Sequence, residues 1–264
     1  MEAGPKDIPI TQLIIRENSM KVITLVFLIL TSLSAAAADK VLYVLTNHAA
    51  LGETDKRTGF FLSELTHPYY KIKDAGYEIE LASPLGGPAP IDPKSLDLKD
   101  KTNQRFFKDT KLLGEIQTTK KLSEVDLSTY KAIVFAGGHG TMWDFPKSMD
   151  VKNAVKTIYE GGGVVAAVCH GPAALVDIKL SNGKYLVDGK KLAVFTDEEE
   201  KVVKLENVVP FLLESKLLKQ GGKKFSGEPW TENAVVDNRL VTGQNPQSAS
   251  KLGKLVVKEL EKLK

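Results

Sequence analysis

GGVVAAVCHGP, residues 162–172, places the single cysteine of this 264-residue chain at the end of an apolar run. Small and β-branched residues after two glycines predict a buried strand over residues 164–168. Gly171 and Pro172 interrupt that strand, and the alanines that follow predict a helix with Pro172 in its first turn. Cys169 is therefore expected at a strand-to-helix corner, above the C-terminal edge of a sheet.

This corner has a chemical consequence for Cys169. Backbone N–H groups and the positive end of a helix dipole lower the pKa of a thiol, so we expect thiolate character. The arrangement is that of a nucleophile elbow with cysteine in place of serine. A lone cysteine can instead be a small buried hydrophobe. His170 beside it and the Gly-Pro break favour the catalytic interpretation.

The pattern on either side predicts an α/β chain. Strand-like apolar runs occupy residues 40–46, 77–82, 132–136, 164–168 and 192–195, and a hairpin is expected at 234–236 and 240–242. Helical spacing is found at residues 59–74, 103–113, 123–125, 151–160, 210–220 and 247–262. Strands that alternate with helices predict a three-layer sandwich, in which helices cover both faces of a mostly parallel sheet. Sites gather at the C-terminal strand ends of such sheets, which draws attention to the loops after Thr46, Ala136 and Val168.

His170 and a nearby acidic cluster are candidates for acid–base chemistry. A histidine pKa suits a general base at neutral pH. Adjacent residues at a tight turn can diverge, so His170 need not contact the sulfur of Cys169, and it can equally be a histidine satisfied at a turn. Asp197–Glu200 follow the predicted strand 192–195 and can supply an orienting carboxylate. A run of acids is also typical of a solvated surface.

Two further segments are candidates for the same site. Gly137-Gly138-His139-Gly140 follows a predicted strand, and glycines there allow backbone amides to approach a ligand, as an oxyanion hole requires. The alternative is a plain glycine-rich turn. Glu64 lies in an aromatic-rich helical stretch, where burial would keep its carboxyl protonated and able to donate to a thiolate. The alternative is an exposed helix carboxylate.

Composition and spacing exclude several function classes. The chain is 42% hydrophobic and 26% charged, which fits one globular domain, and its formal net charge is only +3. Scattered lysines do not indicate nucleic-acid binding. The glycine-rich run lacks the spacing of a dinucleotide or P-loop fingerprint, so no cofactor is expected. The dispersed histidines and the lack of CxxC or HExxH predict no metal site.

The N-terminus has the features of a targeting segment. Met20-Lys21 precede an apolar stretch at residues 22–33, and small residues end at Ala38. We interpret residues 20–38 as a cleavable signal peptide, which predicts a periplasmic or secreted protein without stable membrane association; a retained anchor is the alternative. Residues 1–19 are interpreted as an upstream extension from a misassigned start, and residues 39–264 as a single domain.

These motifs resemble the ThiJ/PfpI superfamily, and within it the chaperone/glyoxalase III branch. The resemblance implies a flavodoxin-like, class I glutamine amidotransferase-like fold. It spans residues 40–260, and the segments that carry it are Thr58–Leu65, Ala82–Gly87, Asp92–Ser95, Gly137–Gly140, Ala167–Pro172 and Val241–Pro246. No distant His-x-Glu follows the cysteine, which disfavours a glutamine amidotransferase.

The resemblance assigns roles to the candidate residues. It implies Cys169 as nucleophile, His170 as proton shuttle and Glu64 as the carboxyl that hydrogen-bonds the sulfur. The amides of Gly138 and of Val168 or His170 would lie near the oxyanion, and His139 near the substrate. The third member of the triad is an acid a few residues after Phe195; Glu200 fits first and Glu199 second.

The resemblance also implies a reaction without a cofactor, in which a small α-oxoaldehyde, methylglyoxal, becomes lactate. Repair of glycated amines is a related activity of the superfamily. The alternatives are a holdase chaperone that binds unfolded proteins, a thiol redox sensor and, less favoured, a peptidase. Related proteins are often homodimers, so a homodimer is the expected assembly.

Overall fold

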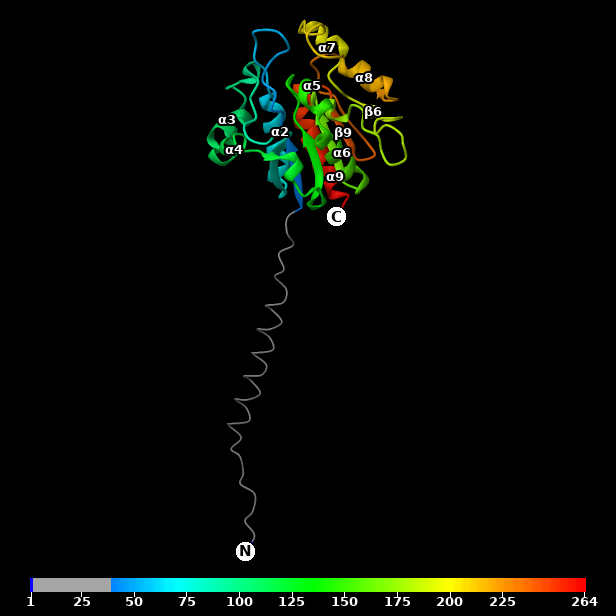
Figure 1. Cartoon of the computed structure of the whole chain (residues 1–264). Helices are drawn as coiled ribbons and strands as arrows, with labels where there is room; N and C mark the ends of the chain where they lie inside the picture. Colours follow the sequence, from blue (N-terminus) through cyan, green and yellow to red (C-terminus); the bar gives the residue numbers. More distant parts are fainter. Residues whose placement is uncertain (2–38) are drawn as a thin grey trace. The chain divides into compact units, whose positions relative to one another are not determined.

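A seven-stranded sheet forms the centre of the computed structural model, which describes Met1 and residues 39–264 (Figure 1). The strand order is β3-β2-β1-β4-β5-β9-β8, and every pair is parallel except the β8–β9 hairpin. The strands of this sheet are β1 (Lys40–Val44), β2 (Glu78–Ser83), β3 (Lys120–Lys121), β4 (Tyr130–Phe135), β5 (Val164–Val168), β8 (Ala234–Asp237) and β9 (Leu240–Gly243). The order reverses between β1 and β4, which marks the sheet edge where ligands bind in such folds.

Helices connect these strands. The α-helices are α2 (Leu62–Asp74), α3 (Lys101–Lys108), α4 (Thr110–Glu115), α5 (Thr141–Asp144), α6 (Met149–Glu160), α7 (Asp197–Val202), α8 (Leu213–Lys219) and α9 (Ala249–Glu261). Short 3₁₀ helices are η1 (Pro93–Ser95), η2 (Leu122–Glu124), η3 (Leu127–Thr129), η4 (Phe145–Lys147), η5 (Gly171–Leu175) and η6 (Pro246–Ser248). No helix within residues 39–264 is long and apolar enough to cross a membrane.

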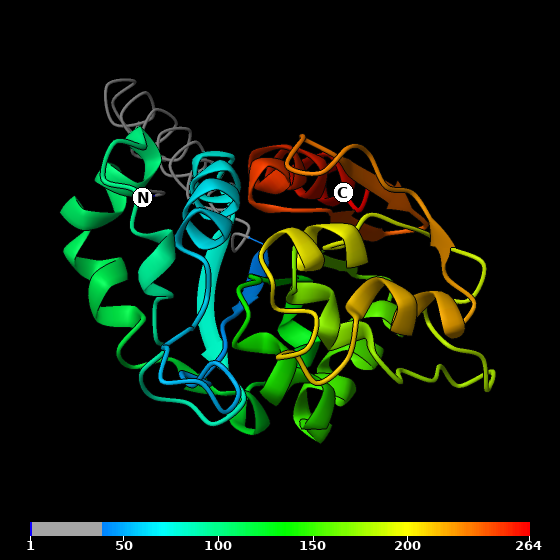
Figure 2. The same ribbon diagram turned by 90° about the horizontal axis from the view of Figure 1, so that it is seen from above.

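Both faces of the sheet are covered, as predicted. Successive residues of a strand point to opposite faces. In β5, Val164 and Ala166 belong to the core shared with α2 and α9, whereas Val165 and Ala167 belong to the core shared with α6. Figure 2 shows α2 and α9 on one side of the sheet and the green helix α6 on the other. The expectation of a three-layer sandwich with a mostly parallel sheet is confirmed.

The predicted strand at residues 192–195 is wrong. Only Lys191–Leu192 form a strand, β6, which pairs with β7 (Lys223–Lys224) in a separate two-stranded sheet. The residues after it are held by single hydrogen bonds and not by a ladder. The N–H of Ala193 donates to Oγ1 of Thr242, and the N–H of Phe195 donates to the carbonyl of Cys169. This apolar run is buried because it crosses the C-terminal ends of β5 and β9.

The helix expected after Pro172 is a short 3₁₀ segment and not an α-helix. Gly171–Leu175 form one 3₁₀ segment, η5, and the backbone becomes extended at Val176. Without an α-helix here, no aligned helix dipole lies beneath Cys169.

Helix α2 begins at Leu62, three residues later than the spacing suggested, because the preceding chain pairs with a neighbouring loop. The N–H of Phe60 donates to the carbonyl of Pro90 at 2.8 Å. The Cβ of any residue at Gly59 would lie 2.0 Å from that carbonyl oxygen, so only glycine fits. This pairing places the first turn of α2, with Glu64, beneath the end of β5. The predicted signal peptide (20–38) and the extension (1–19) lie outside the described residues.

Candidate active site

Cys169 lies directly after β5 in a rigid, strained corner. Its backbone φ is 60°, a left-handed conformation that a non-glycine residue adopts only when its surroundings impose it. The N–H donates to the carbonyl of Gly243 at 2.8 Å, and the carbonyl accepts the N–H of Phe195 at 3.0 Å. Both backbone groups are thereby held, and the side chain, 3% exposed, points into a small cavity. The predicted nucleophile-elbow geometry is present without the predicted helix.

His170 contacts its own neighbour in the chain. Its Nδ1 lies 3.3 Å from the Sγ of Cys169. The sequence left open whether adjacent side chains at this turn diverge; the structure brings them together. The histidine is buried, with an exposed fraction of 1%.

Glu200 lies behind His170 and contacts two histidines. Its Oε2 is 2.7 Å from Nε2 of His170, and its Oε1 is 2.9 Å from Nε2 of His139. Burial opposes ionisation, but the charge of His170 and the hydrogen bonds from both imidazoles hold the pKa of Glu200 at about 2. An ionised carboxylate only accepts hydrogen bonds, so both Nε2 atoms must carry protons.

This bonding determines the form of His170. Burial and the adjacent His139 lower the pKa of His170, against the opposing effect of Glu200. The imidazole is therefore neutral at pH 7, with its proton on Nε2. Its Nδ1 lone pair faces the thiol and is ready to accept the thiol proton.

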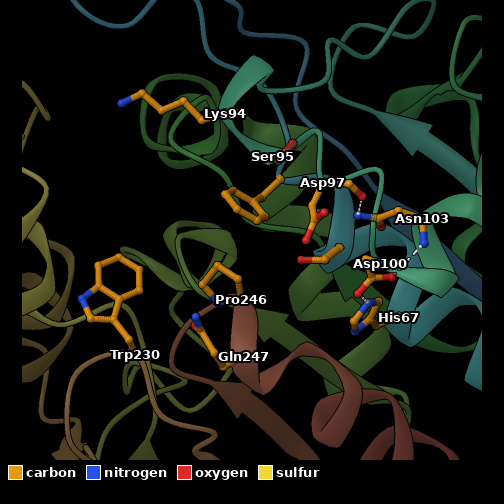
Figure 3. Close-up of a pocket in the computed structure, with 11 residues that line it drawn as sticks. His67, Lys94, Ser95, Asp97, Asp100, Asn103, Trp230, Pro246 and Gln247 are labelled. Carbon is orange, nitrogen blue, oxygen red and sulfur yellow. Dashed lines mark hydrogen bonds and ion pairs between the residues drawn. The ribbon is translucent and has the colours of Figure 1, made fainter.

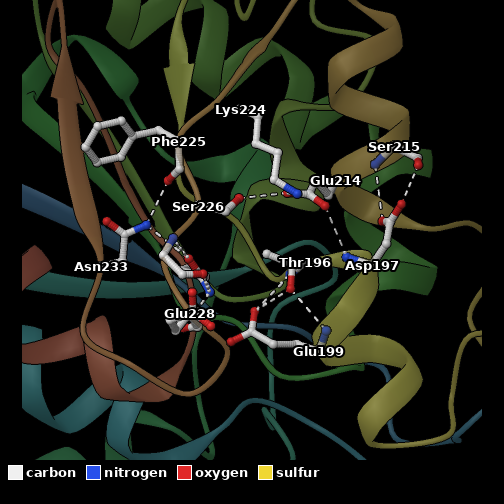
Figure 4. Close-up of polar contacts among 12 residues, drawn as sticks. Thr196, Asp197, Glu199, Glu214, Ser215, Lys224, Phe225, Ser226, Glu228 and Asn233 are labelled. Carbon is white, nitrogen blue, oxygen red and sulfur yellow. Dashed lines mark hydrogen bonds and ion pairs between the residues drawn. The ribbon is translucent and has the colours of Figure 1, made fainter.

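Glu199 has a different place. Its Oε2 accepts the N–H and the hydroxyl of Thr196 in a capping box that starts α7 (Figure 4). Its Oε1 accepts the N–H of Trp230 at 2.9 Å and the amide of Asn245 at 2.8 Å. Glu199 thus holds the start of α7, while the next residue, Glu200, faces the histidines. Of the two acids left open by the sequence, the structure places Glu200 at His170.

Glu64 lies in the first turn of α2 and is fully buried. Burial raises its pKa well above the usual range, and the Cys169 thiol and the N–H of Gly137 only partly oppose this. Neither carboxyl oxygen makes a well-formed hydrogen bond with another of the described residues. Its carboxyl is therefore protonated at neutral pH and can donate to the sulfur when the thiolate forms.

The expectation of a lowered pKa for Cys169 is wrong. Burial raises the pKa of this thiol well above its usual range, and the neighbouring Glu64 raises it further. A hydrogen bond from the backbone N–H of His170 lowers the pKa, but it does not offset these two effects. Burial is the main cause, and no α-helix begins at this corner to oppose it. Cys169 rests as a thiol and must lose its proton to His170 as it reacts.

Two backbone N–H groups in the wall of the cavity are candidate donors to an oxyanion, and one of them, that of His170, also faces the sulfur of Cys169. Within residues 39–264, the N–H groups of Gly138 and His170 donate to no backbone carbonyl. Gly138 has φ +100°, and a Cβ there would lie 2.3 Å from the carbonyl oxygen of Gly59. Val168, by contrast, is the fully buried last residue of β5, pairs with Gly243 and does not line the cavity. Of the two donors expected beside Gly138, His170 fits and Val168 does not.

The cavity above the sulfur has a volume of about 90 Å³, roughly the space of three water molecules. It is almost entirely apolar apart from the catalytic groups. The ring of Phe195 lies 4.3 Å from that of His170, and Trp230 contacts Phe195 edge-on at 5.6 Å. The further lining residues are Phe61, Asp92, Lys94, Gly138, His139, Cys169, Val203, Leu205 and Pro246. Such a space fits a small organic molecule.

His139, His170 and Glu200 also form a cluster with metal-ligand chemistry. Their ligand atoms lie within 4.8 Å of one another. The residues come from three segments far apart in the chain, the loop after β4, the turn after β5 and helix α7, so sequence spacing did not indicate the cluster. Both Nε2 atoms already donate to the carboxylate, and a metal ion would have to replace these hydrogen bonds.

Sequence reasoning missed two features of this site. It expected His139 near the substrate but did not predict the hydrogen bond between His139 and the carboxylate of Glu200. It also did not identify Trp230, whose ring helps to line the cavity and whose backbone φ is 61°. The first contact depends on the fold alone, whereas an aromatic residue in a loop between β7 and β8 carries no distinctive signal.

Comparisons with known proteins identify the family of this chain. The chain matches the model of the DJ-1/PfpI family over residues 57–259. It is 35% identical to the glutathione-independent glyoxalase HSP31 of Saccharomyces cerevisiae, over 81% of this chain and 94% of that protein. It is similar in structure to the rapid encystment protein of 24 kDa from Francisella tularensis, with a TM-score of 0.81, 42% identity and coverage of 84% and 99% of the two chains. It also matches glyoxalase III of Candida albicans, with a TM-score of 0.77, 33% identity and coverage of 84% and 97%. The chain therefore belongs to the DJ-1/PfpI family.

Proposed function

We propose that this protein is a glutathione-independent glyoxalase, which converts methylglyoxal and water to lactate. The observation that carries the proposal is the chain of contacts from Cys169 through His170 to Glu200 at the base of a cavity of about 90 Å³. The similarity to proteins named as glyoxalases supports it. Within the site, the groups of the protein itself supply the nucleophile, the base and the oxyanion donors.

The first step is attack on the aldehyde carbon. Nδ1 of His170 takes the thiol proton as the sulfur bonds to that carbon, and the carbonyl oxygen becomes an oxyanion. The N–H groups of Gly138 and His170 are placed to receive it. Transfer of the proton from His170 to this oxygen gives a hemithioacetal and returns the imidazole to its neutral form. The fixed carboxylate of Glu200 stabilises the transient imidazolium.

The second step moves hydrogen between the two substrate carbons. The neutral imidazole of His170 removes the proton from the carbon bonded to sulfur, and the neighbouring carbonyl oxygen is protonated, which gives an enediol. A proton then returns to the second carbon while the first hydroxyl loses its own. The product is a lactoyl thioester on Cys169. Because the cavity is small and mostly apolar, it shields the enediol from side reactions.

The third step is hydrolysis. Water attacks the thioester carbonyl, with its proton passing to His170. The carbon–sulfur bond then breaks, lactate leaves, and the departing sulfur takes a proton to restore the thiol. The raised pKa of Cys169 favours this return to the thiol form. The reaction consumes one water and needs no external oxidant or reductant.

The test is lactate formation from methylglyoxal without glutathione, measured for the wild type and for Cys169→Ser. We expect lactate from the wild type and a loss of at least about a thousandfold in the variant, with an unchanged melting temperature. Absence of lactate from folded wild type with a reduced thiol would overturn the proposal.

The alternative functions have less support from the site. A holdase for unfolded proteins does not need the His170–Glu200 pair, and its activity would survive Cys169→Ser. A thiol sensor would show sulfenic or sulfinic acid at Cys169 under mild peroxide. Release of glycated amines uses the same nucleophile and would be lost together with lactate formation. A peptidase needs an accessible nucleophile, and a thiol that is 3% exposed in a small cavity does not favour one.

We also infer that the protein is a homodimer, by analogy with its family. Light scattering on the purified chain tests this directly, since a monomer mass at working concentration would contradict it.

A further inference from the structure

A second, larger cavity adjoins the catalytic one. Its volume is about 320 Å³, and the two cavities share Phe61, Lys94, Trp230 and Pro246 in their walls. Figure 3 shows Trp230, Pro246 and Gln247 on one side of this outer cavity and Asp97, Asp100 and His67 on the other. A molecule longer than methylglyoxal, with its reactive end at Cys169, would therefore extend along these shared residues into the larger outer cavity.

The outer cavity contains polar groups that the protein does not itself use. Among the described residues, the hydroxyl of the half-buried Ser63 and the side-chain amide of the exposed Gln247 have no hydrogen-bond partner within the chain, and both line this cavity. Ser63 directly precedes Glu64 in the first turn of α2, and Gln247 follows Pro246 in η6. Ser63 is therefore adjacent in the chain to Glu64 of the active site, and Gln247 is adjacent to Pro246, which lines both cavities.

The two carboxylates of the outer cavity are hydrogen-bonded within the protein. Asp100 accepts Nε2 of His67 at 2.9 Å and caps α3 through two backbone N–H groups. Asp97 accepts the N–H of Lys99 at 2.8 Å. Lys94 contributes one cation to the same wall. Both carboxylates are thus held by groups of the protein, and Ser63 and Gln247 remain to exchange hydrogen bonds with a ligand.

We propose that the outer cavity is a subsite for the hydroxylated tail of sugar-derived 2-oxoaldehydes. This inference rests on the proposed glyoxalase function and names a wider substrate class for the same site. The aldehyde and ketone carbons occupy the inner cavity at Cys169, while the hydroxyl groups of the tail bond to Ser63 and Gln247. Phe61, Trp230 and Pro246 supply the apolar surface against which the carbon chain packs.

The test compares kcat/KM for methylglyoxal and for 3-deoxyglucosone, a 2-oxoaldehyde with a hydroxylated tail. The double variant Ser63→Ala/Gln247→Leu removes the two free polar groups. Gln117→Leu, an exposed residue that lines neither cavity, is the matched control. Dicarbonyl loss is followed by derivatisation to a quinoxaline.

We expect the double variant to lose roughly tenfold in kcat/KM for 3-deoxyglucosone, the effect of two hydrogen bonds of ordinary strength. Its kcat/KM for methylglyoxal should stay within about twofold of the wild type, as should both values for Gln117→Leu. Two results would overturn the subsite and leave the glyoxalase function standing. One is an equal loss of kcat/KM on both substrates in the double variant. The other is a wild type that turns over methylglyoxal but not 3-deoxyglucosone. A wild type inactive on methylglyoxal would instead contradict the proposed function itself.

Discussion

Cys169 and His170 follow one another in the chain and nevertheless face each other, with Sγ 3.3 Å from Nδ1. The left-handed backbone at Cys169, with φ 60°, turns the chain at the point where β5 ends. The N–H of Cys169 remains bonded to Gly243, so the turn is rigid. In consequence, nucleophile and base come from a single corner, and only the carboxylate behind the base must be supplied by a distant segment.

The first prediction concerns that carboxylate. Glu200→Gln removes the charge that orients His170 and stabilises its protonated form, so we expect kcat for methylglyoxal to fall by roughly a hundredfold or more. The neighbouring Glu198 is exposed, and Glu198→Gln should retain activity within about twofold. Steady-state kinetics of both variants, with circular dichroism to verify folding, makes the comparison. Equal activity of the two variants would remove Glu200 from the mechanism.

The second prediction is the acidic limb of the pH–rate profile. The pKa of His170 is lowered from its ordinary value of 6.5 by burial and by His139. Because the neutral imidazole is the base, kcat/KM should fall only at a pH below 6.5, where the imidazole takes up a proton. A profile of kcat/KM between pH 4.5 and 8 measures this limb. A limb centred above pH 6.5 would show that another group titrates.

A third prediction concerns Gly138. Gly138→Ala meets two penalties, because φ is +100° and the new Cβ would lie 2.3 Å from the carbonyl oxygen of Gly59. Gly76 has φ +91° with no atom within 4 Å of its Cβ position, so Gly76→Ala isolates the conformational penalty. We expect Gly76→Ala to lower the free energy of unfolding by about 1–2 kcal/mol and to retain activity. Gly138→Ala should lower it further and lose activity, as urea denaturation and kinetics would show; a Gly138→Ala enzyme with full activity would contradict the oxyanion assignment.

The fourth prediction concerns stability and Asp144. This carboxyl is buried, which raises its pKa to about 6, although Thr46 and the N–H of Asn47 hydrogen-bond to it at 2.7 and 2.9 Å. The folded state keeps the proton to a higher pH than the unfolded state, whose value is near 3.8. The stability that this proton confers is therefore present below pH 3.8 and lost as the pH rises through 6.

The Asp144→Asn variant has a neutral amide at this buried position, so no charge has to be desolvated. Its free energy of unfolding at pH 7.5 should exceed that of the wild type by about 1–3 kcal/mol. The difference should shrink at pH 4, where the wild-type carboxyl is protonated. Urea denaturation at the two pH values measures it, with the exposed Asp55→Asn as control. A difference that does not vary with pH would show that Asp144 does not carry the effect.

The fifth prediction concerns export. We propose that residues 20–38 direct the chain across a membrane and are removed after Ala38. The intact mass of the protein from a periplasmic or secreted fraction should then correspond to a chain that begins at Asp39. A mass that includes residues 20–38 in a membrane fraction would favour the retained anchor.

The choice between Glu199 and Glu200 as the acid at His170 could have been made from the sequence alone. Thr196-Asp197-Glu198-Glu199 has the spacing of a capping box, in which the fourth residue bonds back to the first. The structure contains this box, and it occupies Glu199. The pattern alone therefore favoured Glu200 as the acid that remains free to face His170.

Local sequence determined the sandwich, the end of β5 at Cys169 and the glycine-rich loop after β4, because apolar periodicity and Gly-Pro breaks act over a few residues. Tertiary structure decided the electrostatics. The pKa values of Cys169, Glu64 and Glu200 depend on burial and on partners far away in the chain, and η5 replaced the helix expected to lower the thiol pKa. Tertiary structure also decided that residues 193–195 form no strand of the central sheet. Their hydrogen bonds to Cys169 and Thr242 can form only when β5 and β9 are already side by side.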